Sequence, residues 1–298
     1  MSDRPFQSVA VLKGGPSAER EISLKSGAAV ARGLREAGYD VVEVDVTARE
    51  IVLPEGVEAV FIALHGEFGE DGQAQALLDA MEVPYTGSGA VGSRNAMDKV
   101  LTKRAFDAHD IPSPAYEVLV RGMDRTLALP VVVKPVAQGS SIGVHRVTSE
   151  AEWSASVTDA YRFGDRLLVE TWVSGRELTV SVIERTPLPV VEIVAPNGWY
   201  GYEAKYTKGQ TRYCVPADIP AEVAAEAQQI ALRTFDALEC CGVGRVDFLL
   251  SETVDLVVLE LNSIPGFTET SLLPKAACAA GMTFSQLCDR IMRTAGNK

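Results

Sequence analysis

Two pairs of polar side chains in the last third of the sequence have the types and spacing of a metal site. Arg245 and Asp247 alternate within one apolar run, and Glu260 and Asn262 alternate within the next. Residues two apart in a strand share one face, so each pair points to one side. Carboxylate and amide oxygens suit Mg²⁺, which completes its shell with waters and substrate phosphates.

The two runs, "VGRVDFLL" and "LVVLELN", lie on either side of "SETVD" and are predicted to form a hairpin. We assume a turn centred between positions 253 and 254. Asp247 then lies opposite Glu260, and Arg245 lies opposite Asn262. The side chains expected on the other, apolar face are Val246, Phe248, Leu259 and Leu261.

Two carboxylates this close repel each other unless a cation lies between them. The hairpin therefore points to a bound divalent metal. A solvated polar face, with a salt bridge through Arg245, is the competing interpretation, and these residues alone leave both open.

Other segments carry groups that suit a nucleotide. Lys134 ends the apolar run "VVVKP", and the loop after it is rich in glycine and serine, so its backbone N–H groups can turn toward an anion. Glu170 and Glu177 flank Trp172 and Val173, where an aromatic ring and ribose hydroxyls could bind. A chance lysine in a hairpin loop and a core tryptophan are the alternatives.

The N-terminal half adds weaker candidates. Glu19 stands in "GGPSAERE" at the start of a predicted helix, where it would repel a phosphate and welcome an ammonium, or simply complement the helix dipole. His65 ends a predicted strand and could touch a ligand or satisfy a turn. Lys99 lies on a polar helix, where lysines are usually solvated.

Strands and helices must position these groups. Over the first ninety or so residues, the predicted strands "SVAVLKGG", "VVEVDV" and "AVFIALHG" alternate with helical segments, which implies a parallel sheet covered on both faces. After "IPSP" the pattern indicates antiparallel strands around glycine turns. A helix at "PAEVAAEAQQIALRTFDAL", the hairpin and a terminal helix follow.

Composition narrows the class of protein. A chain of 298 residues with 47% apolar content can bury a full core divided among two or three domains. The net charge of −12 argues against nucleic-acid or anionic-membrane partners. No apolar run approaches a membrane span, and the five cysteines lack metal-ligand spacing, so we expect a cytoplasmic protein with reduced thiols.

Read in order, these and neighbouring segments resemble the D-alanine–D-alanine ligases of the ATP-grasp superfamily over essentially the whole chain. The matching blocks are "GGPSAEREISL", "ALHGEFGEDG", "PYTGSG", "MDKVLTK", "VVVKP", "GSSIGV", "EAKY", "GRVDF" and "LELNSIPGFTETSLLP". The resemblance implies a mixed α/β and α+β fold: an ATP-grasp fold preceded by a Rossmann-like domain with a parallel sheet. The expected domains are 1–92, 93–178 and 179–298.

The same resemblance implies roles for individual residues. Those expected to bind ATP are Lys99, Lys134, Glu170, Thr171, Trp172, Val173, Glu177 and Lys205. Two Mg²⁺ ions, with Mn²⁺ able to substitute, are expected at Asp247, Glu260 and Asn262. The first D-alanine is expected at Glu19, Ser140, Tyr206 and His65, and the second at Ser271 and Leu272. Arg245 and the backbone at Gly266 would stabilise charge on the reacting groups.

The implied reaction forms D-alanyl-D-alanine for peptidoglycan through a D-alanyl phosphate, in a homodimer. Tyr206, where ester-forming relatives have phenylalanine, favours the dipeptide. Two alternatives remain: an ATP-grasp ligase for other acids and amines, and a catalytically silent nucleotide-binding module. The complete set Arg245, Asp247, Glu260 and Asn262 argues against the silent module.

Overall fold

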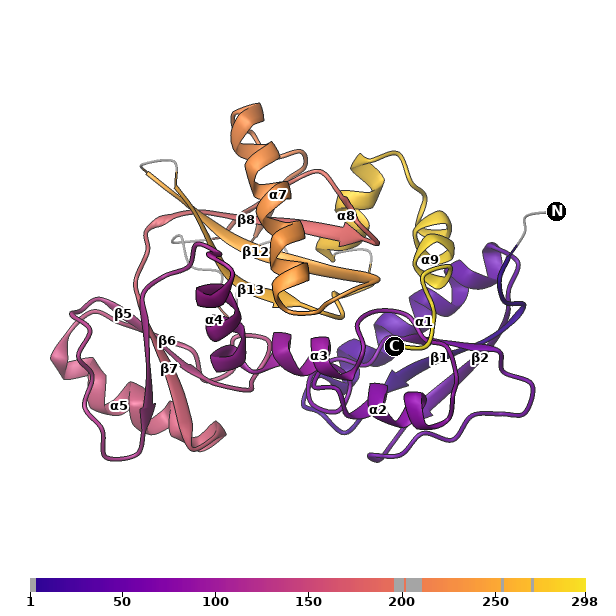
Figure 1. Cartoon of the computed structure of the whole chain (residues 1–298), viewed down its shortest axis with the longest axis horizontal. Coiled ribbons are helices and arrows are strands. Elements are labelled where there is room, and N and C mark those ends of the chain that lie inside the picture. Colours follow the sequence, from indigo (N-terminus) through magenta and orange to yellow (C-terminus); the bar gives the residue numbers. More distant parts are fainter. Residues whose placement is uncertain (1–3, 196–200, 202–210, 253–254, 269–270) are drawn as a thin grey trace.

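Three β-sheets and the helices that cover them form the structure, a computed structural model that describes residues 4–195, 201, 211–252, 255–268 and 271–298. A three-stranded sheet and a four-stranded sheet lie at opposite ends of the molecule in Figure 1, with a six-stranded sheet between them. The predicted combination of a parallel N-terminal sheet with antiparallel sheets after it is confirmed.

The N-terminal sheet is parallel and has the order β2-β1-β3. Its strands are β1 (Ser8–Gly14), β2 (Asp40–Val46) and β3 (Ala59–Ile62). The helices of this region are α1 (Arg20–Glu36), α2 (Gln73–Ala80) and α3 (Ala90–Met97). Residues 9–12 of β1 are fully buried, as expected for a parallel strand with both faces covered.

The four-stranded sheet is antiparallel and has the order β4-β7-β5-β6. Its strands are β4 (Tyr116–Val120), β5 (Val131–Pro135), β6 (His145–Val147) and β7 (Arg166–Thr171). The helices around it are α4 (Lys99–Ala108), α5 (Glu150–Ala160) and the short 3-10 helix η1 (Tyr161–Phe163). Leu119, Val133 and Val169 form part of its separate core.

The six-stranded sheet has the order β11-β10-β8-β12-β13, with β9 paired to β8. Its strands are β8 (Gly175–Ile183), β9 (Thr186–Pro187), β10 (Val191–Val194), β11 (Arg212–Cys214), β12 (Val243–Ser251) and β13 (Leu256–Asn262). Helix α7 (Ala221–Ala237) packs Ile230 and Phe235 into one core with Val246 and Phe248. Only residues 172–174 connect β7 to β8, so this short segment joins two sheets.

The last two helices return to the N-terminal sheet (Figure 1). They are α8 (Leu272–Ala279) and α9 (Phe284–Met292), and α9 lies against α1. Gly33 permits this approach, since a Cβ there would lie 2.9 Å from Cys288 Sγ. Tyr39 donates a hydrogen bond to Asp289 (2.8 Å), and Gly296 bridges Tyr85 beside β3.

Two further features bear on the class of protein. No helix in the described part of the chain has both the length and the apolar character needed to cross a membrane. The five cysteines are free thiols. The expected domain limits near residues 92 and 178 fall inside α3 and β8, and the three-domain division stays a prediction.

Candidate active site

The hairpin of β12 and β13 has the predicted register at the polar residues. Asp247 lies opposite Glu260, and Arg245 lies opposite Asn262. Val246 and Leu261 turn to the buried apolar side, as predicted. The carboxylates and the amide are thus adjacent on two neighbouring strands, which is the arrangement that a metal site requires.

A β-bulge after Asp247 changes the register toward the turn. Phe248 pairs with Val258 instead of Leu259, so Leu259 is the extra residue on β13. Leu259 lines a pocket together with Leu249. The prediction that Leu259 faces the apolar core is therefore wrong. The assumed turn positions, 253 and 254, lie outside the described residues.

Asp247 is a buried carboxylate, 6% exposed, whose two oxygens are well hydrogen-bonded. Arg245 donates from Nε to Oδ1 and from Nη2 to Oδ2, at 2.8 Å each. Thr179 Oγ1 lies 2.6 Å from Oδ1, and Asn262 donates to Oδ2 at 3.0 Å. These contacts hold Asp247 facing Glu260, and the charge-assisted bonds offset the cost of its burial.

The donor set fits Mg²⁺ better than zinc or another soft metal. The described residues contain no group of three or more His, Cys, Asp or Glu side chains that could hold a metal. Asp247, Glu260 and Asn262 supply two carboxylates and one amide, all hard oxygen donors. Mg²⁺ is commonly bound by one or two carboxylates, with waters and phosphates as the other ligands.

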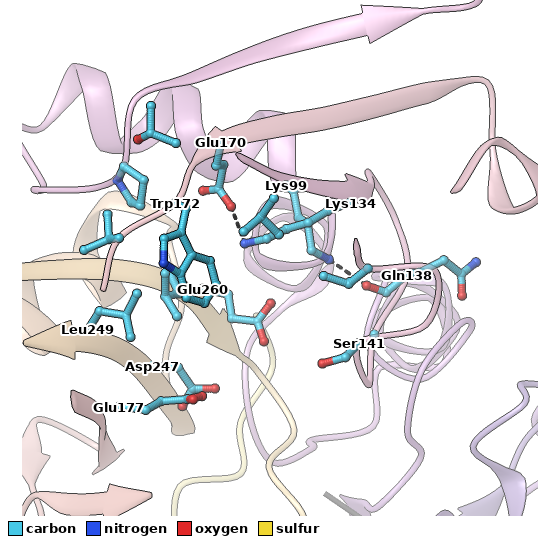
Figure 2. A pocket seen from close by; sticks show the side chains of 17 residues that line it. Lys99, Lys134, Gln138, Ser141, Glu170, Trp172, Glu177, Asp247, Leu249 and Glu260 are labelled. Atoms are coloured by element: carbon cyan, nitrogen blue, oxygen red, sulfur yellow. Dashed lines mark hydrogen bonds and ion pairs between the residues drawn. The ribbon is translucent and has the colours of Figure 1, made fainter. Parts of the chain in front are cut away.

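A pocket of about 890 Å³, its open mouth included, lies between the four-stranded and six-stranded sheets. The predicted residues that line it are Lys99, Lys134, Glu170, Thr171, Trp172, Val173, Glu177, Asp247 and Glu260. Figure 2 shows the lysines on one side of the pocket and Asp247 with Glu177 on the other. A ligand that is anionic beside the lysines and offers hydrogen-bond donors to the carboxylates would match both sides of the pocket.

Lys99 reaches this pocket because Asp98 caps helix α4. The Asp98 side chain accepts hydrogen bonds from the backbone of Val100 and Leu101, which fixes Lys99 as the first helical residue. A cation is disfavoured at that end by the helix dipole. Lys99 Nζ donates to the Gln138 carbonyl at 2.6 Å, as Figure 2 shows. The placement favours a ligand-binding lysine over a solvated one.

Glu170 lies between two ammonium groups. It is 2% exposed; Lys134 pairs with Oε2, and Lys103 Nζ lies 2.6 Å from Oε1. Burial alone would raise the pKa of Glu170, but the charges of Lys134 and Lys103 outweigh it and bring that pKa down to about 2. Lys103 was not predicted from the sequence. A signal was present, because Lys103 follows Lys99 by four residues and so shares its helix face.

The segment between the sheets is held by its backbone. Thr171 N donates to Ala115 O at 2.9 Å, and Trp172 N donates to Pro130 O at 3.0 Å. Trp172 is half-buried and lines the pocket, so it is not a core residue. The Arg146 guanidinium lies 4.1 Å from the centre of the indole ring, a cation–π contact that fixes the ring plane.

Glu19 lies at the N-terminus of α1, where the helix dipole favours a carboxylate. Ser140 donates a hydrogen bond to it from the loop after β5. A Cβ on Gly66 would lie only 2.6 Å from Glu19 Oε2, so this glycine, in the loop after β3, makes room for the carboxylate. Glu19 and Ser140, two of the residues expected at the first D-alanine, are thus in direct contact. Tyr206, the third member expected here, and Lys205 lie outside the described residues.

Glu70 is a second carboxylate at this point and was not predicted from the sequence. It is half-buried and accepts a hydrogen bond from Gly66 N at 2.6 Å. Burial raises the pKa of Glu70, and the charge of Glu19 raises it further. Two carboxylates in one small site favour a cationic group such as an ammonium. The available signal was the second acidic residue in "GEFGEDG".

His65 is 5% exposed, and its Nε2 lies 3.0 Å from Ser26 Oγ. Burial lowers the pKa of His65 to about 4, and the Arg245 charge acts in the same direction. The imidazole is therefore neutral near pH 7. Ser26 Oγ also accepts from Phe267 N at 3.4 Å, which connects His65 to the segment that contains Gly266.

The segment after the hairpin brings Gly266 next to Ser271. A Cβ on Gly266 would lie 2.7 Å from Ser271 Oγ, so a larger residue would displace that hydroxyl. Ser271 is the N-cap residue of α8, and its Oγ lies 2.8 Å from Thr268 Oγ1. Leu272 begins the helix and is buried. The first turn of α8 thus presents backbone N–H groups beside Gly266, a position that suits a carboxylate.

The chain resembles known proteins along most of its length. A family model described as D-ala D-ala ligase C-terminus matches residues 103–293, and one described as D-ala D-ala ligase N-terminus matches residues 48–88. A D-alanine–D-alanine ligase of Syntrophotalea carbinolica is 47% identical over 290 residues, 95% of this chain and 94% of the relative.

Solved structures agree with the family models. The crystal structure of a D-alanine–D-alanine ligase from Bacillus anthracis superposes with a TM-score of 0.85 at 30% identity, covering 97% of each chain. A structure of the Bacillus anthracis ligase complexed with ATP gives a TM-score of 0.86 at 28% identity, also covering 97% of each chain.

The buried neutral His65 predicts a pH-dependent stability. The folded pKa, about 4, lies below the unfolded value of about 6.5, so falling pH protonates the unfolded state first. From pH 7 to pH 4 the free energy of unfolding of the wild type should fall by about 3 kcal/mol through this group, a loss that His65→Gln should not show. Urea unfolding at several pH values measures this. His109→Gln, at an exposed histidine, should parallel the wild type, and a parallel curve for His65→Gln would contradict the prediction.

Proposed function

The chain belongs to the D-alanine–D-alanine ligase family, and from this premise we propose how its cleft carries out the family's reaction. It is an ADP-forming, ATP-dependent ligase that joins two D-alanines, and peptidoglycan synthesis is the role that follows from the family. One observation carries the proposal. Lys134, Asp247 and Glu260 line one pocket, and Glu19 with Ser140 lies beside its wall, since a Cβ on the lining residue Gly139 would be 3.1 Å from Glu19 Oε2.

ATP binds, in this proposal, in the pocket between the two sheets. The adenine ring lies at residues 170–173, and Glu177 accepts from the ribose. Lys99, Lys134 and Lys205 contact the phosphates. Support comes from the two lysines on the pocket wall and from the half-buried Trp172, whose ring plane is held by Arg146.

We propose Asp247, Glu260 and Asn262 as the ligands of two Mg²⁺ ions, with Mn²⁺ able to substitute. The bound metal supplies charge neutralisation at the phosphates. The chain's own contribution is geometric, since Arg245 and Thr179 hold Asp247 toward Glu260. Arg245 also offers its guanidinium to the reacting carboxylate and phosphoryl group.

The first D-alanine places its ammonium at the carboxylate of Glu19. Ser140 and Tyr206 position the Glu19 carboxylate, and His65 lies beside this subsite. Glu70 places a second carboxyl group at the same subsite, and burial together with the charge of Glu19 raises its pKa to about 8, which an ammonium at this point would lower. A free carboxylate is a poor acyl donor, so the γ-phosphoryl group is transferred to it and a D-alanyl phosphate forms. Water must be excluded from this intermediate, because it would hydrolyse the acyl phosphate, and we propose that Lys205 and Tyr206 help to cover the site.

The second D-alanine places its carboxylate at Ser271 and Leu272, at the first turn of α8. Its deprotonated amine attacks the acyl phosphate, the C–N bond forms and phosphate leaves. The oxyanion of the tetrahedral intermediate is stabilised by Arg245 and by backbone N–H near Gly266. The proximity of Gly266 and Ser271 supports this arrangement, because one short segment then serves both the oxyanion and the second substrate.

We also propose a cytoplasmic homodimer. ATP is an intracellular substrate, which supports the location. Three partly exposed apolar residues, Leu77 and Met81 at α2 and Val91 in α3, supply a surface that a second copy could cover.

The activity itself is tested by coupled release of ADP. The protein with ATP, Mg²⁺ and D-alanine should release ADP and phosphate and form D-alanyl-D-alanine, because the cleft joins nucleotide and amino-acid subsites. L-alanine and D-lactate serve as comparisons and should support much less turnover. ADP release that ignores D-alanine, or that prefers another acid or amine, would reject the proposed substrate.

Replacement Glu19→Gln should weaken the first D-alanine subsite. Loss of a charge-assisted hydrogen bond is worth about 1.5–3 kcal/mol, so KM for D-alanine should rise roughly 10- to 100-fold while KM for ATP changes little. Steady-state kinetics measure both. Glu21→Gln, an exposed acid in the first turn of the same helix, is the matched control. Equal effects of the two replacements would show that Glu19 has no specific role.

Replacement Glu260→Ala should lower kcat roughly 100-fold or more, since even outer partners of a bound metal commonly cost 10–100-fold. Thermal unfolding should change little, because the Asp247 contacts to Arg245 and Thr179 remain. Glu222→Ala, at an exposed glutamate in α7, is the control. Wild-type turnover in Glu260→Ala, at limiting as well as saturating Mg²⁺, would refute the metal role.

A further inference from the structure

A lysine behind the pocket wall takes no direct part in the site described above. Lys103 is 1% exposed and does not line the pocket. Its ammonium lies 2.6 Å from Glu170 Oε1 and 3.4 Å from the Pro114 carbonyl. It also lies 5.9 Å and 5.6 Å from the ring centres of Phe106 and Tyr116. Every direction of this ammonium is therefore filled by protein.

Burying a third charge here needs a physical reason. Glu170 and Lys134 already make a complete ion pair, and desolvating a further ammonium costs several kcal/mol before its attraction to Glu170 is counted. Burial accordingly lowers the pKa of Lys103. A methionine of similar shape would fill the same space without that cost. With Lys103 present, the buried group has two positive charges and one negative charge.

We propose that Lys103 is a positioning residue for the nucleotide phosphates: it balances the Glu170 carboxylate so that the charge of Lys134 remains available to the pocket. The proposal rests on the proposed function, because it takes the pocket to be the ATP site. Lys134 is 13% exposed and lines the pocket, whereas Lys103 is sealed behind Glu170. Lys134 therefore contacts the phosphates, and Lys103 compensates the charge of Glu170.

The other charges of the pocket make this compensation necessary. Glu177, Asp247 and Glu260 line the same space as Glu170, and the charges of Glu170, Glu260 and Glu177 all act on Lys134. A nucleotide brings further negative charge into this pocket. Without Lys103, the Glu170–Lys134 pair is neutral and Lys99 is left as the other lysine on the pocket wall. With Lys103, the buried group keeps one net positive charge behind the phosphates.

The experiment compares ADP with adenosine by calorimetry in the presence of Mg²⁺. Lys103→Met should lower the affinity for ADP roughly tenfold or more, because one nearby positive charge is lost. It should lower the affinity for adenosine about twofold or less. The double variant Lys103→Met/Glu170→Gln restores one net positive charge. Its ratio of ADP affinity to adenosine affinity should return toward the wild-type ratio. Lys25→Met, which removes an exposed lysine of α1, should leave the ratio unchanged.

The outcomes separate this proposal from a structural role and from failure of the proposed function. Equal weakening of ADP and adenosine in Lys103→Met, or a double variant whose ratio stays low, would overturn it. If Lys103→Met does not fold, the double variant decides: a wild-type ratio supports the proposal and a lowered ratio overturns it. Failure of the wild type to bind ADP, or to release it with D-alanine, would instead reject the proposed function.

Discussion

Several carboxylates lie close together in and beside the cleft between the two larger sheets, and neighbouring groups hold each of them in place. Asp247 is bonded by Arg245 and Thr179, and Glu170 lies between two lysines. Glu19 lies at a helix N-terminus with a serine donating to it. Each carboxylate would be costly to bury alone, and each has a different partner. The polar groups that the reaction needs are therefore held by the same contacts that offset the cost of burying the carboxylates when the protein folds.

The residues of the hairpin show what a sequence pattern can predict. Alternation predicted which side chains share a face, whereas the pairing of Asp247 with Glu260 rested on an assumed turn position and is met in the structure on the far side of a one-residue bulge. The bulge did not follow, because no glycine or proline marks it and one extra residue leaves the alternation intact on either side. Leu259 consequently changed faces.

Lys103 and Glu70 were missed for a different reason. Their sequence neighbourhoods predict a solvated helix and an acidic loop, and their importance comes from partners on other elements. Lys103 meets a carboxylate of β7, and Glu70 meets the charge of Glu19 at α1. Burial and long-range pairing decide the chemistry of such residues, and neither is a local property. The parallel and antiparallel sheets were predictable because apolar periodicity is local.

The contact between α1 and α9 has a consequence for how the protein is made. Tyr39 bonds to Asp289, 250 positions later, and Gly33 lies against Cys288. At a translation rate of roughly 5–20 residues per second, α1 leaves the ribosome about 10 to 50 seconds before its partner helix exists. The part of α1 that contacts α9 stays uncovered for that time, whereas the part that packs on β1 and β2 does not. The sheet that is synthesised first therefore completes its core last.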